Sequence, residues 1–587
     1  MKQALLRAYV FLSFLLLGPA AGAQAPSWQT ADILNQSTLG TPTSSLLGSV
    51  SIVPDAQGNL YVAGYFYGSV TLGTTTLSTA APAGTARNGY VAKWNTITRR
   101  FMWAVQTTGP GDQYITQVAV QGNNVYLAGA FQGATAGFGS TVLPNSSGSS
   151  PYFDGFVAKL VDQGSSADFV WAQGLGGGTQ SGYAEALAVN GANVYVSGSF
   201  ASPVASFGPL TLTNTLAAGG STDIFTAKLV DQGSSASVAW VQGAGGTGND
   251  QGLRMTSSGP NVYLSGTFNG PTATFGSTTL TRATANNNAT NSYVAKLADN
   301  GTTGGFAWVV QEDMSGYSNT MAAQGNSLYL IRSFQGTGVL GTTRFTSAGN
   351  SDLLVAKLTD AGTSASYAWV VQAGGAADEY GVGLAVHGNA VYVGGSFTGA
   401  TLALGAATLT NAAPPKTDAY LAKLTDAGSS ASFTWADRFG GSEPDGGAGL
   451  ALAGNKVYTT AYLSLPATFG SLTLSGPSTS NAPTPCLAAL ADGALASAAK
   501  AARVAFALYP NPARAAITVQ LPAAAARPAS VTVTLLDALG RLVRTSTVPA
   551  TSAALRHELP LRGVPAGMYS VRVTAGEASS TQRLVVQ

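Results

Sequence analysis

The stretch NVYLAGAF, residues Asn124–Phe131, returns as NVYVSGSF at Asn193–Phe200 and as NVYLSGTF at Asn261–Phe268. Related copies of this phrase are centred on seven tyrosines, namely Tyr61, Tyr126, Tyr195, Tyr263, Tyr329, Tyr392 and Tyr458. Successive tyrosines lie 63 to 69 residues apart. A repeat of this length indicates an architecture in which one small unit is built many times and packs against its neighbours.

The rest of each unit has the sequence pattern of alternating strands and turns. A glycine turn follows the phrase, and then come a strand such as DAYLAKL, a turn such as DAGSS and a strand around a tryptophan such as YAWVVQA. These runs are short, rich in Val, Tyr, Phe and Trp, and bounded by Gly, Asn, Asp and Ser, which favours strands. Within VYLAGAF both alternating faces are apolar or small, so the strand is expected to be covered on both sides. The unit is too long for one coil of a β-helix and too short for an immunoglobulin domain, which leaves a propeller blade.

The tryptophans indicate how the array ends. Six units finish on a tryptophan, and these are Trp103, Trp171, Trp240, Trp308, Trp369 and Trp435. The seventh unit, after CLAALADG, has none, whereas Trp28 precedes the first tyrosine copy. We therefore expect the N-terminal strand to complete the last blade, which would pair the edges that an open array exposes.

These motifs resemble the bacterial beta-propeller repeat family, whose units run roughly as vYvaGyf followed by DafvaKl. The resemblance covers about Trp28 to Leu490. In the fifth unit Arg332 replaces the glycine of the phrase, and the seventh unit reads KVYTTAYL, so irregular blades are expected there. The predicted fold class is all-β, with a seven-bladed β-propeller over residues 26–492.

The N-terminal residues 1–25 are predicted to be a secretory signal. Lys2 and Arg7 precede the apolar run AYVFLSFLLL, and AQA at Ala23–Ala25 suits signal peptidase. No later stretch is long and apolar enough to span a bilayer as a helix. The mature chain is therefore expected to leave the cytoplasm.

After an Ala-rich linker at 493–504, residues 505–587 change character. The alternation in VTVTLL predicts half-buried strands and a small immunoglobulin-like sandwich. The motifs YPNP, LGRLV and AGMYSVRV look like the C-terminal sorting domain, of type A, of the type IX secretion system. This resemblance implies transit through the periplasm, recognition by the type IX machinery, and removal of the tail with release or surface anchoring. It says nothing about activity.

Composition excludes several classes of function. Charged residues are 9% of the chain, and residues 26–499 carry a net charge of −7, which argues against nucleic-acid binding. The single cysteine, Cys486, excludes an internal disulfide framework and a cysteine-rich metal site. We expect a monomer without a metal or another cofactor.

Residues able to perform catalysis are sparse. Of two histidines, His387 occupies a turn position and His557 lies in the tail, so no Ser-His-Asp triad can form in the propeller. The segment GAGGTG leads into a strand rather than a helix, which argues against a nucleotide site. The lysines of the AKL strands are expected to lay their stems on apolar surface and to reach water or a carboxylate, and the aspartates of the D-x-G turns to cap backbone amides.

One set of residues is in phase with the repeat and suits a ligand. Four units carry a tyrosine twelve residues before the phrase tyrosine, and these are Tyr114, Tyr183, Tyr317 and Tyr380. Carboxylates stand beside this position at Asp112, Asp250, Glu379 and Asp445. Tyrosine rings stack on sugars while carboxylates accept hydrogen bonds from hydroxyls. The alternative is that the rings pack between blades and the acids cap turns.

These observations predict an exported, non-catalytic binding or adhesion module for glycan or another extracellular polymer. Two alternatives remain open: a polysaccharide hydrolase or lyase that uses propeller carboxylates, and a structural component of the cell surface.

A chain that lacks 505–587 should still cross the inner membrane, because its N-terminal signal is intact, but should stop in the periplasm. Mass spectrometry of the wild-type extracellular product should find no peptide from AGMYSVRV. An intact tail outside the cell would contradict the assigned processing.

Overall fold

The computed structural model describes residues 26–35, 47–80, 86–148, 151–216, 220–282, 290–476, 483–493, 495, 504–522, 530–537, 542–549, 554–575 and 578–587. The elements β1 to β47 are all strands, so the fold is all-β. The chain divides into two compact units, Met1–Ala491 and Asp492–Gln587. The predicted signal at 1–25 and most of the linker at 493–504 lie outside the described residues.

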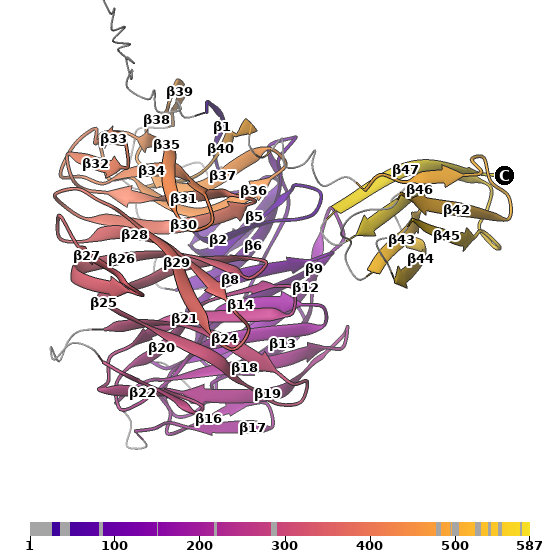
Figure 1. Ribbon diagram of the computed structural model, residues 1–587. Helices are drawn as coiled ribbons and strands as arrows, with labels where there is room; N and C mark the ends of the chain where they lie inside the picture. The colour runs from indigo at the N-terminus through magenta and orange to yellow at the C-terminus, as the bar shows by residue number, and fades with distance from the viewer. Residues whose placement is uncertain are drawn as a thin grey trace, which may run out of the picture. The chain divides into compact units, whose positions relative to one another are not determined.

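The larger unit is built from antiparallel sets of four strands, which follow one another along the chain (Figure 1). Set 1 contains β2 (Leu47–Pro54), β3 (Leu60–Tyr67), β6 (Arg87–Asn95) and β7 (Arg100–Gln106). Set 2 contains β8 (Gln113–Gln121), β9 (Asn124–Gln132), β12 (Phe153–Asp162) and β13 (Ala167–Leu175). Set 3 contains β14 (Gly182–Asn190), β15 (Asn193–Phe200), β18 (Asp223–Asp231) and β19 (Ala236–Ala244).

Sets 4 and 5 are joined, because one long strand is the last of set 4 and the first of set 5. Set 4 contains β20 (Asp250–Ser258), β21 (Asn261–Phe268), β24 (Asn291–Asp299) and the first half of β25 (Gly304–Gln324). Set 5 contains the second half of β25, β26 (Ser327–Leu340), β28 (Asp352–Asp360) and β29 (Ala365–Ala373). Set 6 contains β30 (Glu379–His387), β31 (Ala390–Phe397), β34 (Asp418–Asp426) and β35 (Ala431–Gly440). Set 7 contains β36 (Gly446–Ala453), β37 (Lys456–Leu463), β40 (Thr484–Ala491) and β1 (Trp28–Ile33).

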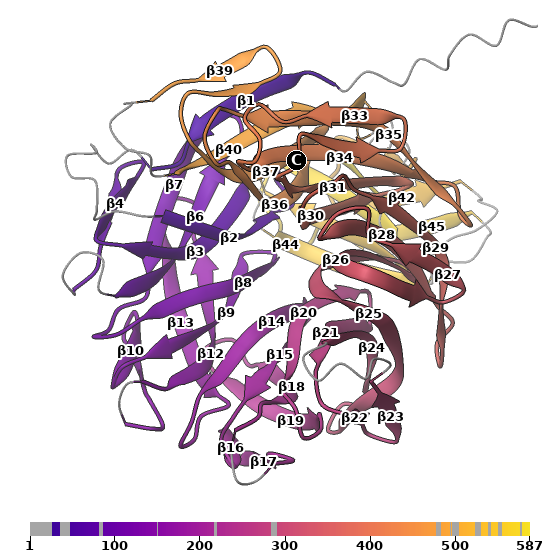
Figure 2. The same cartoon turned by 90° about the vertical axis from the view of Figure 1, so that its left-hand side faces the viewer.

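The sets lie side by side around a common centre, with their first strands innermost, as Figure 2 shows. Each first strand contacts the first strand of the next set, and β36 contacts β2. Short hairpins stand between the second and third strands, and these are β4 (Ser69–Leu72) with β5 (Thr75–Ser78), β10 (Thr135–Phe138) with β11 (Thr141–Pro144), β16 (Val204–Phe207) with β17 (Leu210–Thr213), β22 (Thr272–Phe275) with β23 (Thr278–Thr281), β32 (Thr401–Leu404) with β33 (Ala407–Thr410), β38 (Ala467–Phe469) with β39 (Leu472–Leu474), and β27 (Thr343–Thr346) with the end of β26. The arrangement is propeller-like.

Apolar cores form between neighbouring sets, so the second strands are covered on both faces, as their sequence predicts. One core joins Val91 and Trp103 of set 1 to Val125, Leu127 and Phe131 of set 2. The same combination recurs around the array, because each phrase strand presents one row of side chains to each neighbour. Because one cysteine cannot form an internal disulfide, apolar packing between the sets is the main source of stability.

The glycine of the phrase is explained by a bulge in the adjacent first strand. In β8 the pairing with β9 shifts between Ile115 and Gln117. A Cβ on Gly129 would collide with the carbonyl oxygen of Tyr114, just before that bulge. Gly198 stands in the same relation to Tyr183, and Gly395 to Tyr380. The second strand therefore needs glycine wherever the bulged strand approaches it closely.

The tyrosine of the phrase belongs to a contact between neighbouring sets, which we call the latch. Tyr195 donates its hydroxyl hydrogen to Asp299 of the next set at 2.6 Å, and Lys228 donates to the same carboxylate at 2.7 Å. The indole of Trp240 donates to its second oxygen at 3.1 Å. The D-x-G aspartate of one set thus accepts hydrogen bonds from three residues of the preceding set: the phrase tyrosine, the AKL lysine and the tryptophan.

Five junctions have this complete latch. The accepting aspartates are Asp162, Asp231, Asp299, Asp360 and Asp426. Each also accepts the backbone N–H of the glycine two residues on, as expected for a capping aspartate. The lysines reach a neighbouring carboxylate, which is one of the two outcomes that the sequence predicts for them. The aspartates do more than cap turns, because each joins two sets.

The N-terminal strand pairs with set 7 as predicted. β1 runs antiparallel to β40, with Trp28 opposite Leu490 and Ile33 opposite Cys486. The ring of Trp28 contacts Phe439 and Phe469 edge-on, each at 5.2 Å, and its indole N–H donates to Asp437 at 2.8 Å. Residues from the start of the described chain thus complete a set that begins more than 400 residues later.

Trp28 is not, however, the seventh copy of the repeat tryptophan. In set 1 Trp103 lies opposite Lys93, whereas Phe101 lies opposite the following residue, Trp94. In set 7 the residue at the lysine position is Ala489, and its partner is Thr30. Trp28 therefore takes the place of Phe101.

The latch is correspondingly altered where set 7 meets set 1. Tyr458 bonds to Thr96, which stands at the aspartate position, and this contact carries no charge. Lys93 of set 1 contacts Asp55 at 3.1 Å as well as its latch aspartate. At this junction the tyrosine meets a threonine in place of an aspartate, and β1 adds a whole strand to set 7.

Set 5 is irregular, as expected from Arg332. This arginine is fully buried and donates to Glu312 at 2.8 Å, and Tyr367 donates to the other oxygen of the same carboxylate at 2.8 Å. Glu312 lies in the middle of β25, where set 4 passes into set 5. A buried ion pair thus stands where sets 1 to 4 and set 6 have glycine.

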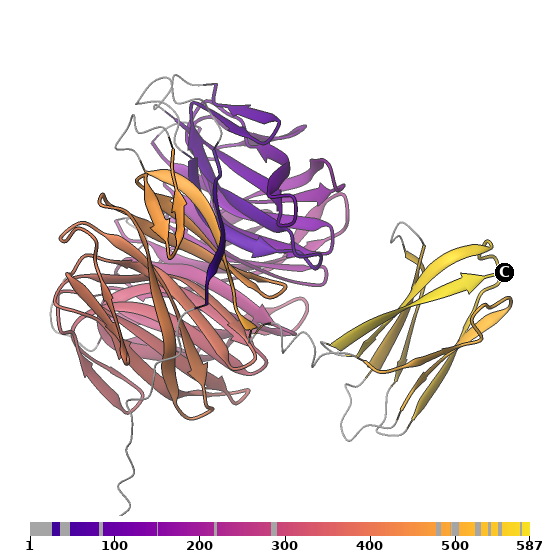
Figure 3. The same cartoon turned by 90° about the horizontal axis from the view of Figure 1, so that it is seen from above.

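The smaller unit is a sandwich of two sheets (Figure 3). One sheet contains β41 (Ala507–Tyr509), β42 (Ala516–Leu521) and β45 (Leu555–Pro560). The other contains β43 (Ser530–Leu536), β44 (Leu542–Pro549), β46 (Gly567–Ala575) and β47 (Ala578–Val586). Its core is formed by alternating residues such as Val531, Val533 and Leu535, as their pattern predicts.

Deletion of residues 27–34 should strongly lower stability, because it exposes the edge of β40 and removes a buried indole. The tryptophan alone is worth about 3 to 5 kcal/mol. Thermal unfolding of the secreted protein is the measurement, and Ile97→Ala, at a residue that is 88% exposed, is the control. An unchanged melting temperature in the deletion variant would show that β1 contributes nothing.

Candidate functional site

The predicted tyrosines lie at one position of the fold, the start of the first strand. Tyr114 is in β8, Tyr183 in β14 and Tyr380 in β30. We call the side on which these strands begin the entry face. Tyr380 is 39% exposed, and Tyr114 and Tyr183 are half-buried. Tyr317 belongs to β25, but its side chain lies outside the described residues.

Two of these tyrosines belong to a larger aromatic surface over sets 1 to 3, which we call the aromatic strip: Tyr65, Arg87, Tyr114, Phe153 and Tyr183. Tyr114 and Phe153 have ring centroids 5.8 Å apart, and Phe153 and Tyr183 are 5.5 Å apart. The guanidinium of Arg87 lies 4.9 Å from the ring centre of Tyr114 and 5.3 Å from that of Tyr65. All five residues are half-buried, so the strip presents ring surface to solvent.

Asp112 fixes the cation of the strip. Its carboxylate accepts the backbone N–H of Arg87 at 2.8 Å and two guanidinium hydrogen bonds at 2.7 and 3.1 Å. Burial raises the pKa of Tyr114, and its ring stays neutral at physiological pH. The strip therefore combines planar apolar rings with one oriented, partly compensated charge, which are the features that recognise the apolar face and the hydroxyls of a sugar.

The other predicted carboxyls are turned into the protein. Asp250 and Glu379 are fully buried and Asp445 is 1% exposed. They accept backbone N–H groups from Gly246, Gly375 and Gly441, respectively. Burial raises the pKa of Asp250 and Glu379 to about 7 and that of Asp445 to about 6. In this structure a ligand on the surface reaches Asp112 but not these three groups.

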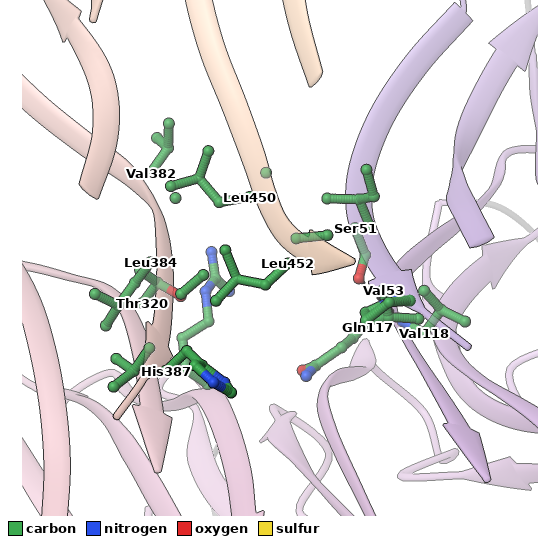
Figure 4. A pocket seen from close by; sticks show the side chains of 18 of the residues that line it. Ser51, Val53, Gln117, Val118, Thr320, Val382, Leu384, His387, Leu450 and Leu452 are labelled. Atoms are coloured by element: carbon green, nitrogen blue, oxygen red, sulfur yellow. Dashed lines mark hydrogen bonds between the residues drawn. The ribbon is translucent and has the colours of Figure 1, made fainter. Parts of the chain in front are cut away.

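A cavity of about 510 Å³ lies at the centre of the array (Figure 4). It is lined by first strands, with aliphatic residues such as Leu450 and Leu452, polar residues such as Gln117, Thr320 and His387, and the charged residue Arg254. His387 is the last residue of β30 and lines the cavity, whereas the sequence predicted a turn residue; the turn begins at the next residue. Among the described residues that line this cavity there is no carboxyl group, whereas most glycoside hydrolases use a pair of carboxyls.

Within the described ranges, no group of three or more His, Cys, Asp or Glu residues is arranged to hold a metal ion. In the same part of the chain, no helix is long and apolar enough to cross a membrane.

Sequence reasoning found the tyrosines in phase with the repeat but missed Tyr65, Arg87 and Phe153. These three lie on second and third strands at the same end of the sets. Tyr65 follows the phrase glycine in set 1, where sets 2 to 4 have Ala130, Ser199 and Thr267, and this difference was the available signal.

Comparison with known proteins identifies the smaller unit. The family model of the secretion system C-terminal sorting domain matches residues 507–587. This part of the chain is a type IX sorting domain, which implies interaction with the type IX machinery and secretion to the cell surface or the extracellular space. No curated protein matches the chain.

Solved structures give only distant likenesses. Trypanosoma rangeli sialidase in complex with sialic acid is 8% identical, with a TM-score of 0.31 over 79% of this chain and 82% of that chain. Trypanosoma rangeli sialidase alone is also 8% identical, with a TM-score of 0.29 over 80% of this chain and 83% of that chain. Dimeric latent PorU from Porphyromonas gingivalis is 14% identical, with a TM-score of 0.12 over 70% of this chain and 33% of that chain. Likenesses this weak carry no argument about function.

Proposed function

We propose that the protein is an exported, closed seven-bladed propeller that binds an extracellular glycan or a similar polymer without converting it. In this proposal residues 1–25 are the cleaved signal, 26–492 form the propeller, 493–504 are a linker and 505–587 are the sorting domain. The pairing of β1 with β40 and the contact of β36 with β2 support closure. The resemblance of the repeats to the bacterial beta-propeller repeat family stays a prediction.

The observation that carries the binding proposal is the aromatic strip. It spans three neighbouring sets and offers half-buried rings at intervals of 5.5 to 5.8 Å, as well as an arginine held by Asp112. Rings at this spacing contact successive parts of one chain-like ligand, and weak contacts in series add up. Tyr380, 39% exposed at the equivalent position of set 6, offers a further contact on the entry face.

Two observations favour binding over catalysis. The central cavity has no carboxyl group among its described lining residues. Of the four carboxyls predicted beside the tyrosines, three are buried against backbone amides and the fourth is neutralised by Arg87. A hydrolase or lyase needs an acid and a base that reach the substrate. A purely structural role at the cell surface would leave the strip without a ligand.

The test is a glycan array with the secreted protein, followed by titration of the best ligand with single variants. Tyr114→Ala and Tyr183→Ala should each weaken binding by about 1 kcal/mol or more, which is roughly fivefold in Kd. Tyr380→Ala reports on the second contact. Ile97→Ala, exposed at the opposite end of set 1, is the matched control and should bind normally.

Unchanged affinity in both Tyr114→Ala and Tyr183→Ala would show that the aromatic strip does not bind the ligand. Release of shorter sugars from a bound polysaccharide would establish the enzyme instead. Absence of binding to every glycan and surface polymer tested would favour the structural role.

A further inference from the structure

At three junctions the fold brings two buried carboxyls together on the entry side. One begins the third strand of a set, and the other begins the first strand of the next set or, in the case of Asp445, directly precedes it. The pairs are Asp223 with Asp250, Asp352 with Glu379, and Asp418 with Asp445. All six residues are at most 3% exposed. Two carboxylates without solvent repel each other and need a compensating positive charge or a proton.

Two of the pairs have a side-chain donor, which is a charged guanidinium in one pair and a neutral amide in the other. Asp418 accepts a guanidinium hydrogen bond from Arg438 at 3.1 Å. Asp352 accepts the side-chain amide of Gln372 at 2.8 Å. Both donors lie on the fourth strand of their set, opposite the second residue after the aspartate. The fold therefore provides one position from which a side chain reaches the pair.

The pair between sets 3 and 4 lacks this donor, because Gly243 takes the position. Gly243 lies opposite Phe225, two residues after Asp223. A Cβ there would find only ordinary contacts, the nearest at 3.5 Å from Leu212. The absence of a side chain is therefore not imposed by crowding.

The two carboxyls of this pair are oriented, and Asp223 keeps one oxygen without a protein donor. Asp223 accepts the backbone N–H and the hydroxyl hydrogen of Thr215 on Oδ2, at 2.6 and 2.8 Å. Asp250 accepts the backbone N–H of Gly246 on its Oδ2 at 2.7 Å, and the backbone N–H of Asn269 also faces this carboxylate. Oδ1 of Asp223 is buried and has no hydrogen-bond partner among the described residues.

The pair converges on Gly245. The position that a Cβ would take on this glycine lies 2.7 Å from Oδ1 of Asp223 and 2.8 Å from Oδ2 of Asp250. Among the described residues, the hydrogen-bond donors of this pair are uncharged, so the site offers carboxylate acceptors without a cation from that part of the chain.

We propose that Asp223 and Asp250 bind a divalent cation of the Ca²⁺ class and that this ion ties set 3 to set 4. Carboxylate oxygens are the donors that hard cations prefer, and Ca²⁺ completes a flexible shell of six to eight oxygens with backbone carbonyls and water. Sites of few carboxylates on extracellular proteins bind Ca²⁺ at roughly 10⁻⁴ to 10⁻³ M. The sorting domain sends the chain to the outside, so the affinity matches its destination.

The test uses the secreted protein after treatment with a chelator. Equilibrium dialysis with radioactive Ca²⁺ measures the bound ion, and thermal unfolding with and without about 10 mM CaCl₂ measures its effect on stability. The wild type should bind Ca²⁺ and unfold at a higher temperature when Ca²⁺ is present. Asp223→Asn and Asp250→Asn should each lose one bound ion and most of this shift.

Asp445→Asn is the matched control, because its pair already has Arg438. This variant should keep both the bound ion and the thermal shift. The Asn variants keep the shape and one acceptor oxygen, so they should fold, and Asp250→Asn should stabilise the ion-depleted protein by removing a buried charge. The proposal is overturned if the wild type binds no Ca²⁺ or if both Asn variants bind as much as the wild type. It is also overturned if stability depends on pH but not on Ca²⁺, because a shared proton would then offset the repulsion between the two carboxyls.

Discussion

One aspartate carboxylate joins each of five neighbouring pairs of sets. It is buried at Asp162, Asp360 and Asp426 and half-buried at Asp231 and Asp299. In the latch on Asp299, a lysine, a tyrosine and a tryptophan from the preceding set and a backbone N–H from its own turn occupy both oxygens. Burial opposes ionisation, but these hydrogen bonds outweigh it and lower the pKa of Asp299 to about 2. A buried ion pair stabilises only when its geometry is good and its remaining hydrogen-bonding positions are filled. Both conditions are met here.

The latch accounts for most of the repeated sequence. In NVYLAGAF, Tyr126 supplies the latch hydroxyl, Gly129 admits the bulged strand β8, and the apolar residues fill the cores on both sides. Where the latch loses its charges, between sets 7 and 1, the chain supplies β1 instead. Because the sets are fixed in this way, loops and strand starts on the entry face vary without loss of the fold. The aromatic strip uses that freedom.

Much of the fold could be predicted from the sequence, because strand, turn and repeat signals are local. The pairing of the N-terminal strand with Leu487 to Leu490 was also predicted and is confirmed. The exact register was not, since a bulge between Trp28 and Thr30 moves the indole to the Phe101 position. The D-x-G aspartates were predicted as turn caps only. The spacing of residues along the chain shows which repeat unit each residue belongs to. It does not show that Lys228 reaches Asp299 of the next set.

The site was predicted less well for the same reason. The tyrosine positions follow from periodicity, and the structure places Tyr114, Tyr183 and Tyr380 at equivalent starts of first strands. The role of Phe153 as the ring between Tyr114 and Tyr183 depends on two different sets meeting. The inward direction of Asp250 and Glu379 depends on loops that wrap their carboxyls in backbone amides. Neither feature leaves a periodic signal.

The most direct test of this account is a double-mutant cycle across one latch, with Lys228→Met and Asp299→Asn measured by denaturant unfolding of the secreted protein. The cycle isolates the energy that passes between two sets. Each single variant should lose about 1 to 3 kcal/mol, because it leaves the partner at a buried or half-buried site without its hydrogen bond. The coupling should exceed ~1 kcal/mol, whereas the exposed pair Lys416 and Glu443 should show less than ~1 kcal/mol. Additive effects of the two latch variants would contradict the claim that these aspartates hold the sets together.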